Sequence, residues 1–212
     1  ALKDADYEVR RNAIFALGWM QSKEAVRPLV VLAESAKDIM TRRRAVQALG
    51  QIGEPAASES LLRLLNDQDG FVRQNAMLAL GWLGEKKAAP LLLDIVRRFA
   101  DERREAEELK KAGKKPSGPK KDVWANEEPL CAMRALGHIG DPAALEALKP
   151  LTVAKTLVDR RDTFAMLSPA AAATYAVAEI DRGGRKEKGV RQMDVLQDTA
   201  HFYWLTDKYN AF

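Results

Sequence analysis

The sequence predicts an all-α fold, a right-handed α-solenoid of stacked helix pairs with a C-terminal capping helix. Its main support is the phrase A-x-x-A-L-G, which occurs four times, at intervals of 32, 31 and 56 residues, the last being one period plus about 25 inserted residues. No segment shows the sustained alternation of a half-buried strand. The glycines of the four phrases are Gly18, Gly50, Gly81 and Gly137.

The first helix of each repeat is predicted from its start signal and its alanine stripe. An aspartate precedes each of the first three, and its carboxylate can accept hydrogen bonds from the free N–H groups of the first turn. An arginine follows four residues later, where it could also bridge to the next repeat. We expect the A-L-G glycine to end the helix, since glycine takes left-handed angles without a Cβ penalty. These aspartates and arginines are Asp6, Asp38, Asp69 and Arg10, Arg42, Arg73.

The second helix of each repeat is predicted from leucine-rich segments at 26–35, 58–67 and 89–100. Turn residues such as Gly53-Glu54-Pro55 separate the two helices of a repeat. Residues 1–100 therefore form three repeats. The opening "ALKDAD" matches "LLNDQD" at 64–69, where a second helix leads into the next repeat. From this match we expect a fragment of a longer protein, with the first repeat truncated on its N-terminal side.

The pattern D-x-x-V-R-x-x-A-x-x-A-L-G-x-I-G-D resembles the HEAT repeat, in the short bacterial form also called the phycobilisome-lyase HEAT-like repeat. The resemblance covers residues 1–100 and 126–148 and is weak after 150. It implies an α-solenoid that presents an extended surface to macromolecules. Family members include scaffolds, chromophore-lyase subunits, a DNA-repair glycosylase and a metal-dependent hydroxylase that relies on His-Glu pairs. Neither His138 nor His201 is followed by Glu, so no metal site and no cofactor are predicted.

The remainder of the chain is less regular. Residues 101–125 are interpreted as a charged insertion, a partly disordered loop whose start could prolong a helix. Residues 126–181 are expected to hold two more divergent repeats, and 182–212 a basic loop and the capping helix. Pro129 stands where the first three repeats have arginine, and the fifth repeat has neither the aspartate nor the arginine. We therefore expect the stacking to loosen beyond the insertion.

The basic character of the chain comes from one tract. The formal net charge is +4, and residues 110–121 contribute six lysines and no acid, so the rest of the chain carries −2. This tract supports an alternative function, nucleic-acid binding, against the simpler interpretation of a solvated loop. Its candidate contacts for a nucleic acid or another anion are Lys110, Lys111, Lys114, Lys115, Lys120 and Lys121.

One position of the first helix varies in an informative way, and we call it the slot: Trp19, Gln51, Trp82 and His138. With two earlier residues of each helix it defines a face that is polar in repeats two and four and apolar in repeats one and three. Either other segments cover the apolar faces, or they bind a partner. On the second interpretation Trp82→Gln should leave the melting temperature nearly unchanged. The candidate partner-binding residues are Phe15, Trp19, Leu78, Trp82 and His138.

The predicted function is a non-enzymatic protein–protein interaction scaffold with a protein partner of unknown identity. No P-loop, nucleophile elbow or metal-ligand spacing occurs, and the single cysteine, Cys131, lies in a helical pattern as a small apolar residue would. The alternatives are nucleic-acid binding and a chromophore-lyase-like subunit. No run of apolar residues is long enough for membrane insertion. The compartment stays unknown, with cytoplasmic as the default expectation.

Overall fold

A computed structural model describes residues 1–114, 127–152 and 169–183. All regular elements in these three ranges are helical, which confirms the all-α class. Short 3-10 turns precede the second helices of the repeats. The helices are α1 (Tyr7–Trp19), α2 (Val26–Ser35), α3 (Ile39–Ile52), α4 (Ser58–Leu64), α5 (Gly70–Leu83), α6 (Ala89–Lys111), α7 (Glu128–Ile139), α8 (Leu145–Leu148) and α9 (Pro169–Asp181).

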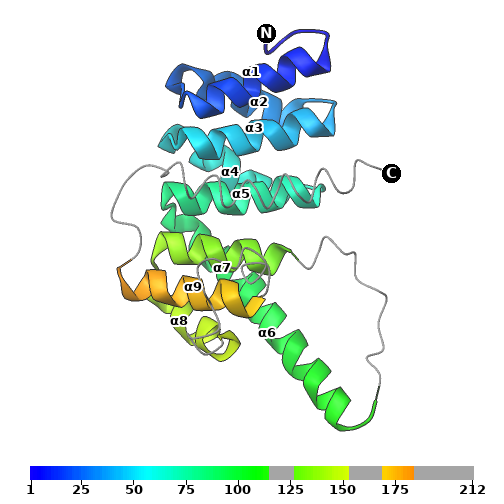
Figure 1. Ribbon diagram of the computed structural model, residues 1–212, viewed down its shortest axis with the longest axis vertical. Coiled ribbons are helices and arrows are strands. Elements are labelled where there is room, and N and C mark those ends of the chain that lie inside the picture. The colour runs from blue at the N-terminus through cyan, green and yellow to red at the C-terminus, as the bar shows by residue number, and fades with distance from the viewer. Residues whose placement is uncertain (115–126, 153–168, 184–212) are drawn as a thin grey trace.

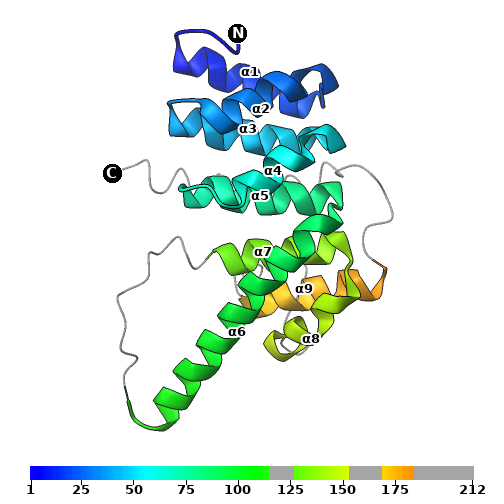
Figure 2. The same ribbon diagram turned by 180° about the vertical axis from the view of Figure 1, so that it is seen from behind.

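The helices form two layers of a stack (Figure 1, Figure 2). The first helices α1, α3, α5, α7 and α9 make one layer, in which each helix contacts the next. The second helices α2, α4, the first half of α6, and α8 make the other layer and pack against the first. Leu29, Leu61 and Leu92 occupy equivalent positions on the second helices and are fully buried between the layers. Each second helix packs mainly on the first helix of the following repeat, as α2 does on α3, α4 on α5 and α6 on α7.

The aspartates at the helix starts are N-caps, as predicted. The Asp6 carboxylate accepts a hydrogen bond from the Glu8 N–H at 2.7 Å, and the Asp69 carboxylate accepts one from the Val72 N–H at 3.0 Å. Asp38 accepts from the second and third residues of α3. Each cap satisfies a backbone donor that has no partner inside the helix.

The prediction that the A-L-G glycines end the helices is wrong. Gly50, Gly81 and Gly137 lie inside α3, α5 and α7. The helices end three residues later, at Gly53, Gly84 and Gly140, which adopt left-handed φ angles of 70°, 65° and 73°. At these three helix ends glycine is required for its backbone angles. The A-L-G glycines serve a different purpose, close packing between repeats.

At Gly50, Gly81 and Gly137 the next first helix approaches too closely for a side chain. A Cβ atom built on Gly81 would lie 2.7 Å from Ala135 Cα, and one built on Gly137 would lie 2.8 Å from Ala176 Cα. The approach is as close after the insertion as before it, so the expected loosening of the helix packing is wrong. The four glycine–alanine contacts are Gly18–Ala48, Gly50–Ala79, Gly81–Ala135 and Gly137–Ala176.

Arginines of the second and third repeats pair with acids of the next repeat, as the sequence suggested, whereas Arg10 donates to the backbone carbonyls of Asp4 and Ala5. Arg43 Nη2 and Nε donate to the two carboxylate oxygens of Asp69, at 2.6 and 2.9 Å. Arg42 pairs with Asp67, and Arg73 Nε donates to Glu128 at 2.6 Å. Burial by itself would raise the pKa of Asp69. The hydrogen bonds from Arg43 and the Val72 N–H outweigh burial, so the pKa is lowered and the carboxylate stays charged.

Replacing Arg43 with alanine should reduce the free energy of unfolding by about 1.5–3 kcal/mol, because hydrogen bonds to a charged, half-buried group are lost. The guanidinium also lies 4.3 Å from the Phe71 ring centroid, a contact that is lost with it. Arg11 is the equivalent residue of the first repeat, and its pair with Glu8 is exposed. Arg11→Ala should therefore cost within about 1 kcal/mol. Urea unfolding of both variants at neutral pH measures the difference.

The effect of pH on the stability lost in Arg43→Ala provides a second test of this prediction. A carboxylate whose folded pKa is lowered stabilises the fold above its unfolded pKa and loses this effect as the pH falls through the folded pKa. The cost of Arg43→Ala should therefore shrink below about pH 4. A cost independent of pH would show that Arg43 acts through packing alone.

Helix α6 continues well past the predicted end of the third repeat. It runs to Lys111 and projects away from the stack as a single helix (Figure 2). The assignment of 101–125 to a loop is therefore wrong for 101–111, where the prolonged helix that the sequence allowed is present. The remainder of that insertion, from 115, and the predicted capping helix, from 184, lie outside the described residues.

Candidate docking surface on the first helix

The structure separates the five predicted partner-binding residues into two groups. Phe15 and Trp19 on α1 are exposed, with 44% and 38% of their surface accessible. Leu78 and Trp82 on α5 and His138 on α7 are buried, at 1%, 7% and 4%. The expectation that these three side chains face outward is wrong. Of the five residues, only Phe15 and Trp19 are placed to contact a partner without a rearrangement of the helices.

Trp82 is buried because the slot faces the preceding repeat. Its ring atoms Cε3 and Cζ3 would lie 2.8 and 2.9 Å from a Cβ on Gly50, beside the contact made by Ala79. Gln51 lies over Gly18 in the same way. The slot is therefore not on a face separate from the alanine stripe, because positions three apart on a helix are neighbours. At Gly18 and Gly50, the slot residue and the alanine three positions before it together cover the A-L-G glycine of the preceding first helix.

Leu78 and His138 are buried for local reasons of their own. Leu78 belongs to the main hydrophobic core. The His138 ring meets the Tyr175 ring of α9 edge-on, with centroids 5.9 Å apart. Since α9 also packs on Gly137, this face of α7 is an interface between repeats.

On α1 the same two rows of side chains are exposed, because no described helix packs on that side of α1. Val9 and Met20 of the alanine stripe are 40% and 69% accessible, and Ala16 is exposed. Phe15 and Trp19 form a tilted aromatic pair with centroids 5.7 Å apart. The surface formed by Val9, Phe15, Ala16, Trp19 and Met20 is called the α1 edge below.

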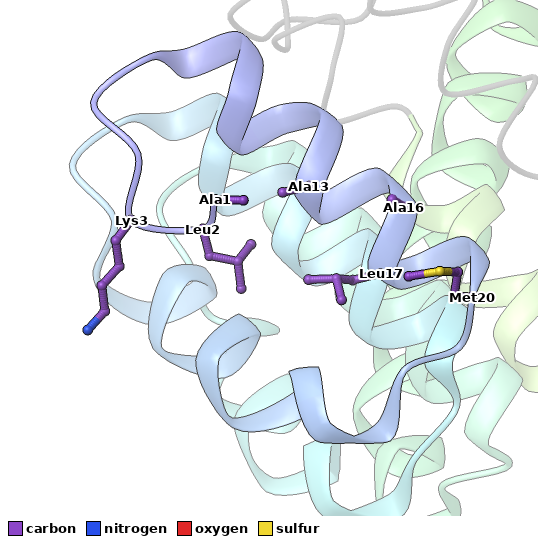
Figure 3. A pocket seen from close by; sticks show the side chains of 7 residues that line it. All are labelled: Ala1, Leu2, Lys3, Ala13, Ala16, Leu17 and Met20. Carbon is purple, nitrogen blue, oxygen red and sulfur yellow. The ribbon is translucent and has the colours of Figure 1, made fainter.

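An open, shallow, mostly apolar groove runs beside the α1 edge (Figure 3). In this view the side chains of Leu17 and Met20 lie near the end of α1, and Lys3 points away from the groove. The groove is lined by Ala1, Leu2, Lys3, Ala13, Ala16, Leu17 and Met20. Ala16 and Met20 belong both to this groove and to the α1 edge.

Two exposed carboxylates lie where α1 begins. Asp4 and Asp6 correspond in the repeat to Asp67 and Asp69, which arginines of the preceding repeat bind. The Asp4 carboxylate accepts a hydrogen bond from the Asp6 N–H at 3.0 Å, and the Asp6 carboxylate accepts one from the Glu8 N–H. The α1 edge is therefore apolar along its length and acidic at one end.

The lysine tract is described only in part. Lys110 and Lys111 end α6 and Lys114 follows it, all exposed, whereas Lys115, Lys120 and Lys121 lie outside the described residues. Residues 101–111, the part of α6 that extends into the insertion, carry five acids and four bases. This part of the helix therefore has no concentrated positive charge. Nucleic-acid binding through these lysines stays a prediction.

Cys131 is buried on α7. The three described ranges contain no group of His, Cys, Asp or Glu placed to hold a metal ion. None of the helices in these ranges is both long enough and apolar enough to span a membrane.

Sequence reasoning missed the outer part of the α1 edge. Val9, Ala16 and Met20 belong to the alanine stripe of the first repeat, a helix face that also includes Ala13 and whose small alanines are expected to let neighbouring helices approach closely. The residue types are those of the buried stripes in α3 and α5, so the sequence of α1 alone contains no signal of their exposure. Only the place of a helix within the stack decides whether its stripe is covered.

Comparisons with known proteins agree with the architecture. A family model described as HEAT repeats matches residues 1–71 and 37–110, and one described as PBS lyase HEAT-like repeat matches residues 132–152. A 62-residue segment is 40% identical to the phycocyanobilin lyase subunit alpha of Synechococcus elongatus, covering 29% of this chain and 22% of that protein.

A similar solved structure is the complex of CpcE and CpcF of phycocyanin lyase from Nostoc sp. PCC7120. The match has a TM-score of 0.54 and 25% sequence identity, and it covers 86% of this chain and 64% of the other. The matches thus span about a fifth of the curated relative and just under two thirds of the chain in the solved structure.

Proposed function

Since this chain belongs to the HEAT-repeat family, we propose that it is a scaffold subunit of a bilin-lyase-type assembly, one that works by binding protein partners. The observation that supports this most is the segment 40% identical to a phycocyanobilin lyase subunit. The structural likeness to a complex of two phycocyanin lyase subunits agrees with it. The proposed function combines two functions considered from the sequence, the protein-binding scaffold and the chromophore-lyase-like subunit. It replaces the prediction of a scaffold with no link to an enzyme.

The arrangement of the side chains favours a role as one subunit of an assembly over catalysis by this chain alone. The only cysteine of the sequence is Cys131, and its side chain is buried on α7. A thiol must reach its reaction partner as the thiolate, and a buried structural thiol is inert. The α1 edge, by contrast, is an exposed apolar surface with an aromatic pair, which is typical of partner binding.

A reconstitution with the Nostoc subunits tests the proposal. The purified chain is mixed with phycocyanobilin and apo-phycocyanin, alone and with CpcE or CpcF separately. We expect complex formation with one of the two subunits, and bilin that stays with phycocyanin on a denaturing gel only when that pair is present. Mixtures that omit one component at a time give the spontaneous background.

Two results would count against the proposal. One is the absence of a complex with either subunit in sedimentation or size-exclusion experiments. The other is a bilin yield with the pair that does not exceed the spontaneous background. Arg11→Ala is a suitable control variant, since this exposed residue lies outside the α1 edge and should not alter the result.

A further inference from the structure

The outer side of the first-helix layer, turned away from the second helices, is buried on α5 and α7 but not on α3. Leu78 lies on this side of α5, opposite Leu80 in the core, because two residues span about 200° of a helix. Gln47 on α3 and Arg134 on α7 occupy the same position of the repeat. Leu78 is 1% accessible and Arg134 is 7% accessible, whereas Gln47 is only half-buried.

The described helices do not account for this difference. Helix α3 lies between α1 and α5 and packs on α2, and α5 lies between α3 and α7 and packs on α4. Both are therefore enclosed on three sides in the same way. No described helix lies over the fourth, outer side, which faces the viewer in Figure 1. The structure contains a single chain, so the additional cover of Leu78 and Arg134 comes from that chain.

The chemistry of this outer side indicates what covers it. Helix α5 contributes the apolar Leu78, and its neighbours α3 and α7 contribute Arg44 and Arg134. An arginine as buried as Arg134 needs an acid beside it, because an unpaired buried charge is costly. A segment with large apolar side chains and acids, and without bases, therefore fits this face.

Residues 192–207 have this composition and lie outside the described ranges. They hold three aspartates, no lysine or arginine, and large apolar side chains such as Leu196, Phe202 and Trp204. We propose that this segment docks along the outer side of α5 and α7, with its apolar side chains on Leu78 and its acids beside Arg134. The segment predicted from the sequence as a cap over the last repeat thus covers the side of the stack.

The connection to α9 is long enough for this placement. Residues 184–191 follow Gly183, just after the end of α9, and α9 packs on α7. Neighbouring helices lie about 8–10 Å apart, so the axis of α5 is about 20 Å from that of α9. Eight extended residues span up to about 28 Å. Residues 192–207 can therefore lie over both α7 and α5.

The other two stretches outside the described ranges fit this face less well. Residues 115–126 hold three lysines and one acid, and lysines beside Arg134 would repel it. Residues 153–168 carry three bases and are tied at both ends, to Thr152 and Pro169. When extended they span at most about 55 Å, and about 40 Å of this would be used to reach α5 from α9 and return.

A photo-crosslinking experiment on the full chain tests the occupant. Gln47 is replaced by p-benzoylphenylalanine, because this half-buried side chain lies at the margin of the covered face. After irradiation and tryptic digestion, we expect the peptide that contains position 47 to be joined mainly to peptide 192–208 of the same chain. Trypsin releases that peptide intact, since it cleaves after Arg191 and Lys208 and finds no base between them.

The matched control carries the same group at Glu59, an exposed residue of α4 in the second layer. Positions 47 and 59 lie on one tryptic peptide, 45–63, so the two digests are compared directly. We expect no product with 192–208 from position 59. A position 47 product joined to residues 153–168, or one that migrates as a dimer, would assign the cover to another segment or to a second copy and overturn the proposal. No enrichment of 192–208 over the control overturns it as well.

The reactivity of the Cys131 thiol gives a second measurement. Cys131 is 4% accessible, whereas Arg44 at the equivalent position of α3 is half-buried, so the docked segment should protect the thiol. Leu196→Asp with Trp204→Asp removes two large apolar contacts. Cys131 of this double variant should therefore react with a maleimide at least about tenfold faster while the helical circular-dichroism signal is kept.

The control for thiol reactivity is Lys186→Asp with Lys188→Asp, which changes two charges outside the segment and should leave the rate unchanged. A rate that stays slow in the folded Leu196→Asp, Trp204→Asp variant contradicts the docking, and the crosslink alone decides if that variant unfolds. The docking does not rest on the proposed function. Failure of the bilin reconstitution alongside the expected crosslink would contradict that function and leave the docking intact.

Discussion

Truncating Trp82 to alanine should reduce the free energy of unfolding by about 3–5 kcal/mol, the usual cost of removing a large buried aromatic side chain. Its ring covers Gly50 of the preceding helix beside Ala79, and only 7% of its surface is accessible. Removing the ring opens a cavity between α3 and α5, the second of the two interfaces between the first helices of repeats one to three. Urea unfolding monitored by circular dichroism measures the change.

Trp19→Ala is the matched control for this prediction. Trp19 occupies the same slot on α1, where it is exposed, so its truncation should change the stability by within about 0.5 kcal/mol. Equal losses for the two variants would show that Trp19 is covered in solution. A negligible loss for Trp82→Ala would show that the α3–α5 interface does not depend on the ring.

The earlier expectation for Trp82→Gln also changes with the geometry. Gln51 lies over Gly18 in the slot of the second repeat, so glutamine fits this position sterically. Replacing Trp82 removes apolar contacts, and it buries an amide where the natural side chain is mostly carbon. An unsatisfied buried amide costs about 1–3 kcal/mol. We therefore expect Trp82→Gln to be destabilised, where an exposed tryptophan would have left the melting temperature unchanged.

The fold could be predicted from the sequence because its period is local and strong. Three copies of one pattern at 31–32 residues define the helix pairs, and the aspartate before each first helix marks where it starts. The helix ends were misplaced because repeats two, three and four each hold two glycines near the end of the first helix. The A-L-G glycine permits a close approach and Gly53, Gly84 or Gly140 supplies the left-handed angle. The residue type alone does not show which of these two roles a glycine has.

The candidate site was harder to predict, because exposure depends on neighbours that the sequence of one helix does not specify. Trp19 and Trp82 share a slot and a local sequence, yet one is exposed and the other covers Gly50. The polar residues in the slots of repeats two and four suggested an outward face. In fact Gln51 and His138 are buried as well, packed against neighbouring repeats. A polar residue at a slot thus gives no reliable sign of exposure in this stack.

Replacing Gly81 with alanine should destabilise the protein by about 1–3 kcal/mol, the typical cost of overpacking. In an exposed helix interior the same change gains about 1 kcal/mol, since alanine favours helix more than glycine does. The sign reverses here because the added Cβ would lie 2.7 Å from Ala135 Cα and 3.0 Å from its Cβ. The first of these is a backbone atom, so α7 would have to move away from α5. Thermal and urea unfolding both report the loss.

Two companion variants isolate the close approach as the cause. Gly70 begins α5, and a Cβ there would meet only the end of the Arg73 side chain, at an ordinary 3.5 Å. Gly70→Ala should therefore be neutral or gain about 0.4–1 kcal/mol through the unfolded state. Adding Ala135→Gly to Gly81→Ala removes the Cβ–Cβ contact but leaves the contact with Ala135 Cα, so only part of the loss should be recovered. A stabilising Gly81→Ala would mean that α5 and α7 do not approach this closely, and that the glycine–alanine contacts do not determine how the repeats stack.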